Sequence, residues 1–436
     1  MTTQIDPAVV AATVVEMLRD GRFDQVEQLF APALAAAVSA ETVRTGWAGA
    51  IAKTGAIRTL GEVIATPIDG DLTRAIVPVH GESGGFEVRL AVDATGRLHG
   101  LRLAPVESTW APPPYVEPRR FVEQEITLEC GPLTVPGTLT LPRGARGVPA
   151  VVLISSGAND RDVTVGPNKP FKDLAWGLAS RGVAVLRFDK VTHVHTQLQH
   201  EPGFTMVEEY LPNVTAAVRF LQEQGGVDPT RVVVAGHSGG GKAAVRVAAA
   251  EPAVAGVVML AADTVPLPRA AARVFHYIAE LDPAAGMGSI LTQAAVAIAR
   301  TEDPALSPET PGAELLFGWP ASYWLDLRQF DQVATAAALD RPILVLQGGR
   351  DYQVTEADDL PAWRVALDGK TDATIQVFAD DDHMFFPGRG PSAPADYEVP
   401  QHVDPAVVDA IVQWLAPDGR GSSMSRLLSR LGRRQS

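Results

Sequence analysis

The sequence of 436 residues is long enough for two or three ordinary domains, and its 46% hydrophobic and 20% charged content is typical of a globular protein with a sizeable core. Its formal net charge of -14 at pH 7 argues against nucleic-acid binding, which normally requires a basic face. Cys130 is the only cysteine, which excludes an internal disulfide and a cysteine-based metal cluster.

The first residues, 1–10, contain no basic residue and no apolar run of the kind that marks a secretory signal. No stretch of the chain reaches the roughly 18 uninterrupted apolar residues that a transmembrane helix needs. We therefore expect a cytoplasmic protein without a membrane span.

Residues 1–105 predict a small α+β domain. Asp6 and Pro7 form a helix-start signal, and apolar residues then recur at helical spacing. Shorter helical patterns follow at residues 23–30 and 40–51. The period then changes to that of strands at residues 57–68, 72–80, 86–93 and 98–103. Helices followed by such strands indicate a small antiparallel sheet with helices beside it.

The proline-rich residues 106–120 predict a stiff linker, and residues 121–416 predict a second, larger domain. After a hairpin at residues 121–141, buried strand patterns alternate with helical patterns. The strand patterns lie at residues 150–154, 183–188, 232–235, 254–260, 343–346 and 374–378. This alternation specifies an α/β domain, with a mostly parallel sheet covered by helices on both faces.

Residues 266–339 interrupt this pattern with a mainly helical, proline-punctuated insertion, which is where a lid over an active site usually lies. Its aromatic residues predict either an apolar acyl or alcohol pocket or only the core of the lid: Phe317, Trp319, Tyr323, Trp324 and Phe330. Residues 417–436 carry five arginines, and we expect a disordered, solvated tail rather than an anchor for an anionic surface.

Residues 231–241 read RVVVAGHSGGG, in which a G-x-S-x-G motif centred on Ser238 follows a buried strand pattern and precedes a helical one. A serine on so sharp a strand-to-helix turn sits in a strained backbone conformation. The positions two before and two after it must therefore be very small, as Gly236 and Gly240 are. Ser238 is the candidate nucleophile, and the alternative is a glycine-rich turn without chemistry.

A serine hydroxyl needs a base that takes its proton, and in this kind of fold an acid and a histidine follow the serine along the chain. Asp351 comes just after the strand pattern at 343–346, and His383 just after that at 374–378. Because the carboxyl ends of parallel strands meet at one edge of a sheet, we predict a catalytic triad of Ser238, Asp351 and His383.

Other residues compete for these roles. Asp263, which follows the strand pattern at 254–260, is the rival acid. For His383 the alternative is a surface histidine beside a solvated acidic run. His237 adjoins the nucleophile, but we expect it to point away from the serine hydroxyl.

Three further histidines, His193, His195 and His200, follow one strand pattern. No cysteine and no H-E-x-x-H pattern accompanies them, so we expect a loop lining the pocket rather than a metal site. We expect neither a metal nor a cofactor.

The oxyanion that forms on nucleophilic attack needs two preorganised N–H donors. We expect Gly239, the residue after the nucleophile, to supply one of them. The other should come from the loop at residues 155–158, with the backbone N–H of Ser156 as the first choice and that of Gly157 as the second.

Five stretches together resemble one bacterial family of α/β-hydrolase-fold esterases and acyl hydrolases with a small N-terminal domain of the DUF3887 type. They are NDRD at 159–162, the run at 166–190, GHSGGG at 236–241, LQGGRDYQV at 346–354 and DDHMFFPG at 381–388. The resemblance extends from about residue 5 to residue 416. It implies an α/β-hydrolase fold, the same triad, and an N-terminal domain similar to nuclear transport factor 2. The family usually has a G-S-G-P run where this chain has Ser155-Ser156-Gly157-Ala158.

The leading hypothesis is a serine hydrolase that cleaves a small-molecule carboxylic ester through an acyl-enzyme on Ser238. A thioesterase or acyltransferase with the same acyl-enzyme is the runner-up, and a peptidase ranks third. A non-catalytic binding protein on a hydrolase scaffold is an alternative of another class. The sequence leaves the role of the first domain open between shaping the pocket mouth, forming a homodimer and acting as a spacer.

Overall fold

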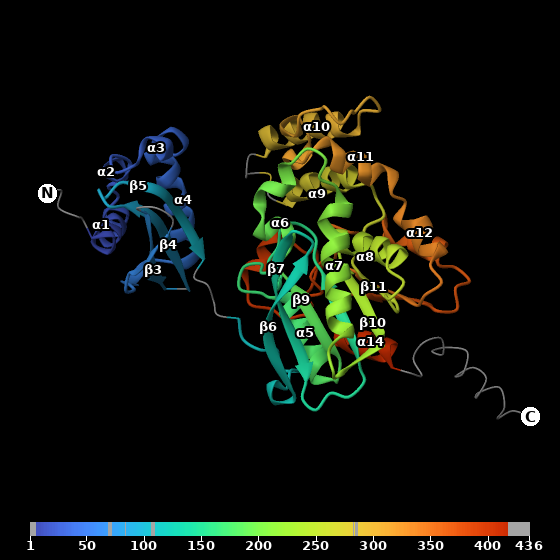
Figure 1. The fold of residues 1–436 in the computed structure, drawn as a ribbon. Coiled ribbons are helices and arrows are strands. Elements are labelled where there is room, and N and C mark those ends of the chain that lie inside the picture. Colours follow the sequence, from blue (N-terminus) through green and yellow to red (C-terminus); the bar gives the residue numbers. More distant parts are fainter. Residues whose placement is uncertain are drawn as a thin grey trace, which may run out of the picture. The chain divides into compact units, whose positions relative to one another are not determined.

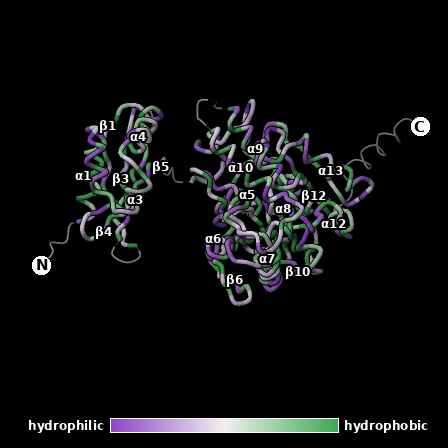
Figure 2. Tube along the Cα trace, turned by 90° about the horizontal axis from the view of Figure 1, so that it is seen from above, coloured by the Kyte–Doolittle hydropathy of each residue, from purple (hydrophilic) through white to green (hydrophobic). Residues whose placement is uncertain are grey.

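The computed structural model describes residues 6–68, 72–82, 84–105, 110–281, 283 and 287–416, and the expected basic tail at 417–436 lies outside them. The chain divides into two compact units, Met1–Thr109 and Trp110–Ser436. Hydrophilic and hydrophobic residues are mixed along the trace of both units (Figure 2). Within the described residues, no helix combines the length and the apolar character needed to cross a bilayer.

The first unit places helices before strands, as its sequence pattern predicts. The helices are α1 (Pro7–Arg19), α2 (Phe23–Glu27), α3 (Pro32–Ala37) and α4 (Ala40–Thr54). The strands are β1 (Ile57–Leu60), β2 (Ile64–Pro67), β3 (Leu72–Gly81), β4 (Gly84–Asp93) and β5 (Leu98–Pro105). They form an antiparallel sheet in the order β1-β3-β4-β5, with β2 also paired to β3. The α+β architecture is therefore confirmed, and the resemblance to nuclear transport factor 2 stays a prediction.

The prediction of a single strand at residues 57–68 was wrong, because β1 and β2 are separate strands on the same edge of β3. Gly61 donates its N–H to the carbonyl oxygen of Pro78 at 2.7 Å, but Pro78 has no N–H with which to continue the ladder. A Cβ on Gly61 would lie 2.9 Å from the Cβ of Pro78. The proline on the neighbouring strand thus interrupts the pairing.

The second unit contains an eight-stranded sheet in the order β6-β7-β9-β8-β10-β11-β12-β13. Its strands are β6 (Phe121–Cys130), β7 (Leu133–Pro142), β8 (Val148–Ile154), β9 (Ala184–Phe188), β10 (Val227–His237), β11 (Val257–Leu260), β12 (Ile343–Gly348) and β13 (Ala373–Phe378). The pairs β6–β7 and β7–β9 are antiparallel, and every other neighbouring pair is parallel. The hairpin at the start of this unit therefore forms one edge of a mostly parallel sheet.

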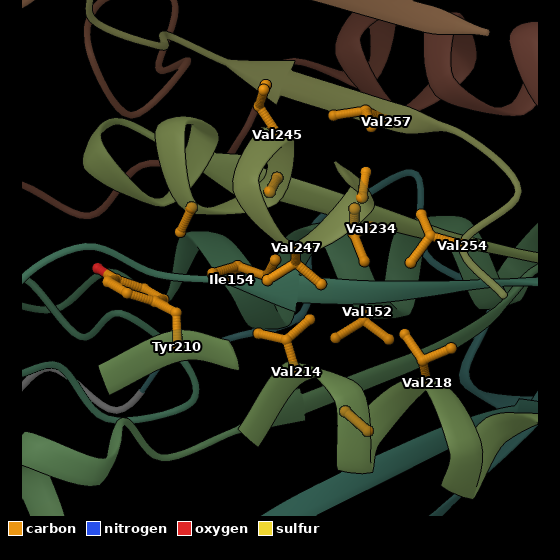
Figure 3. Close-up of a cluster of buried hydrophobic side chains, with 14 of the residues drawn as sticks. Val152, Ile154, Tyr210, Val214, Val218, Val234, Val245, Val247, Val254 and Val257 are labelled. Carbon is orange, nitrogen blue, oxygen red and sulfur yellow. The ribbon is translucent and has the colours of Figure 1, made fainter. Parts of the chain in front are cut away.

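Helices cover both faces of this sheet (Figure 1). Successive strand residues point to opposite faces, and on β8 Val151 and Leu153 pack with α5 (Pro170–Ser180) and α14 (Pro405–Leu415). Val152 and Ile154 pack instead with α7 (Met206–Gln222), α8 (Gly239–Ala250) and α13 (Leu360–Ala366). Figure 3 shows the valine-rich cluster that β8 and β10 share with α7 and α8. This mixed sheet with helices on both faces confirms the expected α/β-hydrolase fold.

Between β11 and β12 the chain forms a helical insertion, and α9, α10 and α11 lie together at one end of the second unit (Figure 1). Its helices are α9 (Leu267–Leu281), α10 (Gly288–Glu302), α11 (Ala321–Gln329) and α12 (Gln332–Ala338), with short turns η4 (Gly312–Glu314) and η5 (Leu316–Gly318). The insertion has a small core of its own around Leu315, Leu316 and Trp324. The remaining short elements are η1 (Pro118–Arg120), α6 (Val191–Val194), η2 (Thr196–His200) and η6 (Pro394–Glu398).

Residues 110–120, where proline content predicts a linker, pack against the second unit. Trp110 donates its indole N–H to Asp173 at 2.7 Å, and the hydroxyl of Tyr115 donates to the carbonyl oxygen of Val403 at 2.8 Å. These contacts attach the segment to α5 and to the loop before α14, which explains why the boundary between the units falls at residue 109.

Candidate active site

The sheet brings the three predicted triad residues to the same edge. Ser238 follows β10, Asp351 comes shortly after β12, and His383 follows β13 by a short loop. The strands β10, β11, β12 and β13 are parallel neighbours, so their carboxyl ends lie side by side. This edge is where ligands of open α/β sheets bind.

Ser238 occupies a strained turn between β10 and α8, with φ 56° and ψ -128°. A residue other than glycine rarely adopts a positive φ, and such strain persists where the surrounding structure enforces it. Here the N–H of Ser238 donates to the carbonyl oxygen of Leu260 at 2.8 Å, and its carbonyl oxygen accepts from the N–H of Gly241 at 2.8 Å. Both bonds fix the serine backbone, and Ser238 lines the cavity described below.

The two glycines that flank the serine have the steric role that the sequence predicts. A Cβ on Gly236 would lie 2.0 Å from the carbonyl oxygen of Gly240, and a Cβ on Gly240 would lie 2.3 Å from that of Ile154. Both distances are far below van der Waals contact. The turn can therefore form only because neither residue carries a side chain.

Replacing Gly236 with alanine should lower the free energy of unfolding by about 3 kcal/mol or more, because the clash is with backbone and cannot be relieved by a rotamer change. Chemical denaturation measures this loss. Gly225→Ala is the matched control, since a Cβ there meets no atom within 4 Å, and it should change stability by less than about 0.5 kcal/mol. A Gly236→Ala protein as stable as the control would contradict the steric account.

His383 and Asp351 form a buried pair. The Nδ1 atom of His383 lies 2.7 Å from Oδ2 of Asp351, and their side chains are 4% and 0% exposed. The other carboxylate oxygen of Asp351 accepts the backbone N–H groups of Gln353 at 2.7 Å and Val354 at 2.9 Å. Gln353 and Val354 also line the cavity, so residues that line the cavity hold the carboxylate in place.

His383 and the two aspartates directly before it are buried rather than solvated, which removes the surface-histidine alternative. Asp381 and Asp382 are 0% and 1% exposed. Oδ1 of Asp382 accepts the N–H groups of Met384 and Phe386 at 2.8 and 3.0 Å, closing a tight loop around His383. Burial raises the pKa of Asp382 to about 6, and burial together with Asp404 raises the pKa of Asp381 to about 8.

His237 has a positioning role that the sequence did not reveal. Its Nε2 lies 2.7 Å from the carbonyl oxygen of His383, and the two rings are 4.6 Å apart between centroids. Burial, and next the nearby His383, lower the pKa of His237 to about 3, so the ring is neutral and donates its Nε2 proton. The residue before Ser238 thus holds the backbone of His383, which lies in the loop after β13. The sequence predicted only that His237 points away from the serine hydroxyl.

Asp263, the rival acid, has another partner. Its Oδ2 lies 2.9 Å from the ammonium of Lys242, and both side chains are buried. Asp351, rather than Asp263, makes the hydrogen bond to His383. The geometry therefore favours Asp351 as the residue that orients the histidine.

The residues expected to bind the oxyanion lie beside the serine. Ser156, Gly157 and Gly239 line the same cavity as Ser238, and a Cβ on Gly239 would lie 3.5 Å from the Cβ of Ser156. The loop that carries Ser156 is held by Asn159, whose side-chain amide donates to the carbonyl oxygen of Ser156 at 2.5 Å. The loop after β8 and the start of α8 therefore meet beside Ser238.

A cavity of about 280 Å³ adjoins Ser238 and is covered by the insertion. Three of the five aromatic residues singled out in the sequence line it, namely Phe317, Trp319 and Tyr323. Trp324 belongs to the core of the insertion, and Phe330 packs under the guanidinium of Arg246 at 4.7 Å. Of the five, three thus line the cavity, one lies in the core of the insertion, and Phe330 packs against the core of the large sheet.

The three histidines after β9 contact backbone carbonyl oxygens. The rings of His193, His195 and His200 lie 3.2, 3.0 and 3.3 Å from the oxygens of Ala158, Thr134 and Gly318. None of them lines the cavity, although the intervening Gln199 does. Among the residues that the structure describes, no group of three or more His, Cys, Asp or Glu side chains is placed to hold a metal ion.

Comparison with known proteins gives two sequence matches. The family described as serine aminopeptidase, S33, matches residues 149–386, a range that includes Ser238, Asp351 and His383. Esterase EstD of Thermotoga maritima is 35% identical over 336 residues, which cover 77% of this chain and 77% of that protein.

Solved structures with a similar fold include Est1E from Butyrivibrio proteoclasticus, with a TM-score of 0.43 and 16% identity, covering 67% of this chain and 97% of Est1E. The esterase domain of a Rhodothermus marinus protein has a TM-score of 0.41 and 17% identity, covering 67% of this chain and 97% of that domain.

Proposed function

Because this chain belongs to the serine aminopeptidase S33 family of α/β-hydrolases, we propose that it hydrolyses carboxylic esters through an acyl-enzyme on Ser238. Ser238 attacks the acyl carbon while His383 takes the hydroxyl proton and passes it to the leaving alcohol. Asp351 orients His383 and stabilises its charged form. Water, deprotonated by His383, then attacks the acyl carbon, releases the carboxylic acid and restores the serine.

The observation that carries this proposal is the 2.7 Å contact between the buried His383 and Asp351, at the same sheet edge as the strained Ser238. The backbone N–H groups of Gly239 and Ser156 are our candidates for the oxyanion donors, because both residues line the cavity at the nucleophile. The esterase name of the Thermotoga maritima relative favours an ester over other acyl compounds.

An aminopeptidase is the second candidate, since the matching family is described by that activity. Such an enzyme must bind the ammonium group of its substrate, for which an unpaired carboxylate near the nucleophile is the natural partner. The two carboxylates that line the cavity, Glu209 and Asp263, each lie 2.9 Å from a lysine ammonium. Each carboxylate is thus already neutralised by a lysine and offers a substrate cation no uncompensated charge, so the cavity favours an ester.

A substrate panel tests this choice. We expect release of p-nitrophenol from p-nitrophenyl esters of short and medium acyl chains, and no detectable release of p-nitroaniline from L-alanine or L-proline p-nitroanilide. The Ser238→Ala protein, assayed with every substrate, corrects for spontaneous hydrolysis. Faster cleavage of an anilide than of every ester would replace the esterase proposal with the aminopeptidase.

The pH dependence should follow the titration of His383. Burial by itself would lower the pKa of His383, but the charge of Asp351 and the hydrogen bond to it raise that pKa above its usual 6.5. Only the neutral ring can accept the proton of Ser238, so kcat/KM should fall as the pH drops through a value above 6.5. In Asp351→Asn the raising charge is gone, and the acid limb of the kcat/KM profile should move to lower pH. If the acid limb of the Asp351→Asn profile did not move, a group other than His383 would control it.

A further inference from the structure

Five buried polar or charged residues line the same cavity as Ser238. We call them the polar wall, and each is less than 10% exposed: Lys190, Glu209, Tyr210, Lys242 and Asp263. Replacing a buried ion pair by apolar residues often leaves a protein equally or more stable. Two such pairs beside a nucleophile are therefore explained better by a ligand than by stability.

The polar wall is built from four segments that meet at the carboxyl edge of the sheet. Lys190 follows β9, Glu209 and Tyr210 belong to α7, and Asp263 follows β11. Lys242 lies on α8 one turn after Ser238, and helix side chains tilt toward the helix N-terminus, here toward the serine. In Figure 3 the hydroxyl end of Tyr210 points away from the valine cluster.

The two carboxylates of this wall are already engaged. Oε1 of Glu209 lies 2.9 Å from the ammonium of Lys190 and accepts the hydroxyl of Thr192 at 3.1 Å, and its Oε2 accepts the hydroxyl of Tyr323 at 2.5 Å. Oδ2 of Asp263 accepts from Lys242 at 2.9 Å. Its Oδ1 has no partner within the described chain but is itself enclosed.

The hydrogen-bond donors of the polar wall are only partly occupied by partners within the protein. An ammonium group carries three N–H donors. Lys190 uses two of them, on Glu209 and on the hydroxyl oxygen of Tyr210 at 2.5 Å, and Lys242 uses one, on Asp263. No acceptor for the hydroxyl proton of Tyr210 occurs in the described part of the chain. Since the unpartnered Oδ1 of Asp263 is enclosed, the hydrogen-bonding capacity that remains for a ligand consists of donors, which call for an acceptor oxygen on the ligand.

The charges of the wall cancel, because two ammonium groups face two carboxylates. A substrate carboxylate would add an uncompensated negative charge to a buried site, and a substrate ammonium would meet donors instead of acceptors. A neutral acceptor avoids both penalties.

We propose that the polar wall binds a second, neutral acceptor oxygen of the substrate, such as a keto, ether or further ester oxygen, and that Lys242 and Tyr210 select esters that carry one. This inference rests on the proposed function, since it names the class of ester that Ser238 cleaves.

A set of matched esters tests the preference. Four ethyl esters share one leaving group and differ in the acyl chain: ethyl pentanoate is apolar, ethyl 4-oxopentanoate carries a neutral acceptor, monoethyl succinate is anionic and ethyl 4-aminobutanoate is cationic. A fifth ester, 2-methoxyethyl pentanoate, places a neutral acceptor on the alcohol side. At least one neutral acceptor ester should exceed ethyl pentanoate in kcat/KM by about tenfold or more, the gain that hydrogen bonds to charged donors give. The two charged esters should be slower than ethyl pentanoate. Equal rates for the neutral esters, or preference for a charged one, would overturn the inference while leaving ester hydrolysis intact. Absence of hydrolysis for every ester would overturn both.

Variants of the wall test its residues. Tyr210→Phe removes one donor and keeps the ring, and the double variant Lys242→Met/Asp263→Leu replaces a whole ion pair with apolar side chains. In each, the ratio of kcat/KM between the preferred acceptor ester and ethyl pentanoate should fall severalfold toward one. The matched control is Arg246→Met/Asp326→Leu, which removes an ion pair of 2.6 Å one turn further along α8 and outside the cavity, and should keep the ratio. Tyr210→Phe provides the test if the double variant fails to fold. A ratio that survives in Tyr210→Phe and in any folded double variant would refute the role of the wall.

Discussion

Replacing Ser238 with alanine should lower kcat for an activated ester by about 10⁵-fold or more, while leaving the folded protein intact. Alanine cannot form the acyl-enzyme, so water would have to attack the ester directly with only the oxyanion donors to help. Steady-state kinetics with a p-nitrophenyl ester measures the loss. A thermal unfolding curve that matches the wild type would show that the turn between β10 and α8 still forms.

The loss should not add to that of a second triad substitution. Residues that act in one chemical step are strongly non-additive, because removal of either disables the same step. The double variant Ser238→Ala/His383→Ala should therefore be about as active as Ser238→Ala alone. If the two losses multiplied instead, the serine and the histidine would be acting independently, and the triad would be wrong.

Substituting Asp351 by asparagine should lower kcat by about 10³- to 10⁴-fold, the second largest effect. The carboxylate accepts from Nδ1 of His383 at 2.7 Å and is itself fixed by two backbone N–H groups. An asparagine can turn its amide toward the ring and stabilise the tautomer whose Nε2 carries the proton, which cannot accept a proton from Ser238. The same kinetic assay, near the pH optimum, measures this change.

Asp263→Asn is the matched control, because Asp263 is the other buried aspartate at this sheet edge and pairs with Lys242 instead. It should cost far less in kcat than Asp351→Asn. If the order of the two effects were reversed, Asp263 would be the acid of the triad and the contact between Asp351 and His383 would be structural.

The parts of the site that were predictable from the sequence depend either on neighbouring residues in the chain or on a position at the end of a strand. The turn at Ser238 needs small neighbours, so the glycines at 236 and 240 predict it. A Cβ at either position would clash with backbone, which confirms the steric reason for these glycines. Asp351 and His383 come soon after buried strand patterns, and parallel strands bring such residues to one edge. Periodicity also located the strands of the large sheet.

The parts that were not predictable depend on partners from distant segments. Lys190 meets Glu209 across β9 and α7, and His237 meets the backbone of His383 across two strand ends, so neither contact has a local signature. The break between β1 and β2 depends on Pro78 of a neighbouring strand, which becomes visible only when the register is known. The burial of Asp381 and Asp382 likewise depends on the tertiary fold, because a polar composition is equally compatible with the alternative of a solvated acidic run.

Labelling with a fluorophosphonate probe tests the central claim most directly, because the probe reacts with a serine only when a neighbouring base activates it. Intact-mass measurement should show one adduct per wild-type chain, peptide mapping should locate it on Ser238, and Ser238→Ala should remain unlabelled. A wild-type protein that takes no label, or a Ser238→Ala protein that labels as fast as the wild type, would contradict the assignment of Ser238 as the nucleophile.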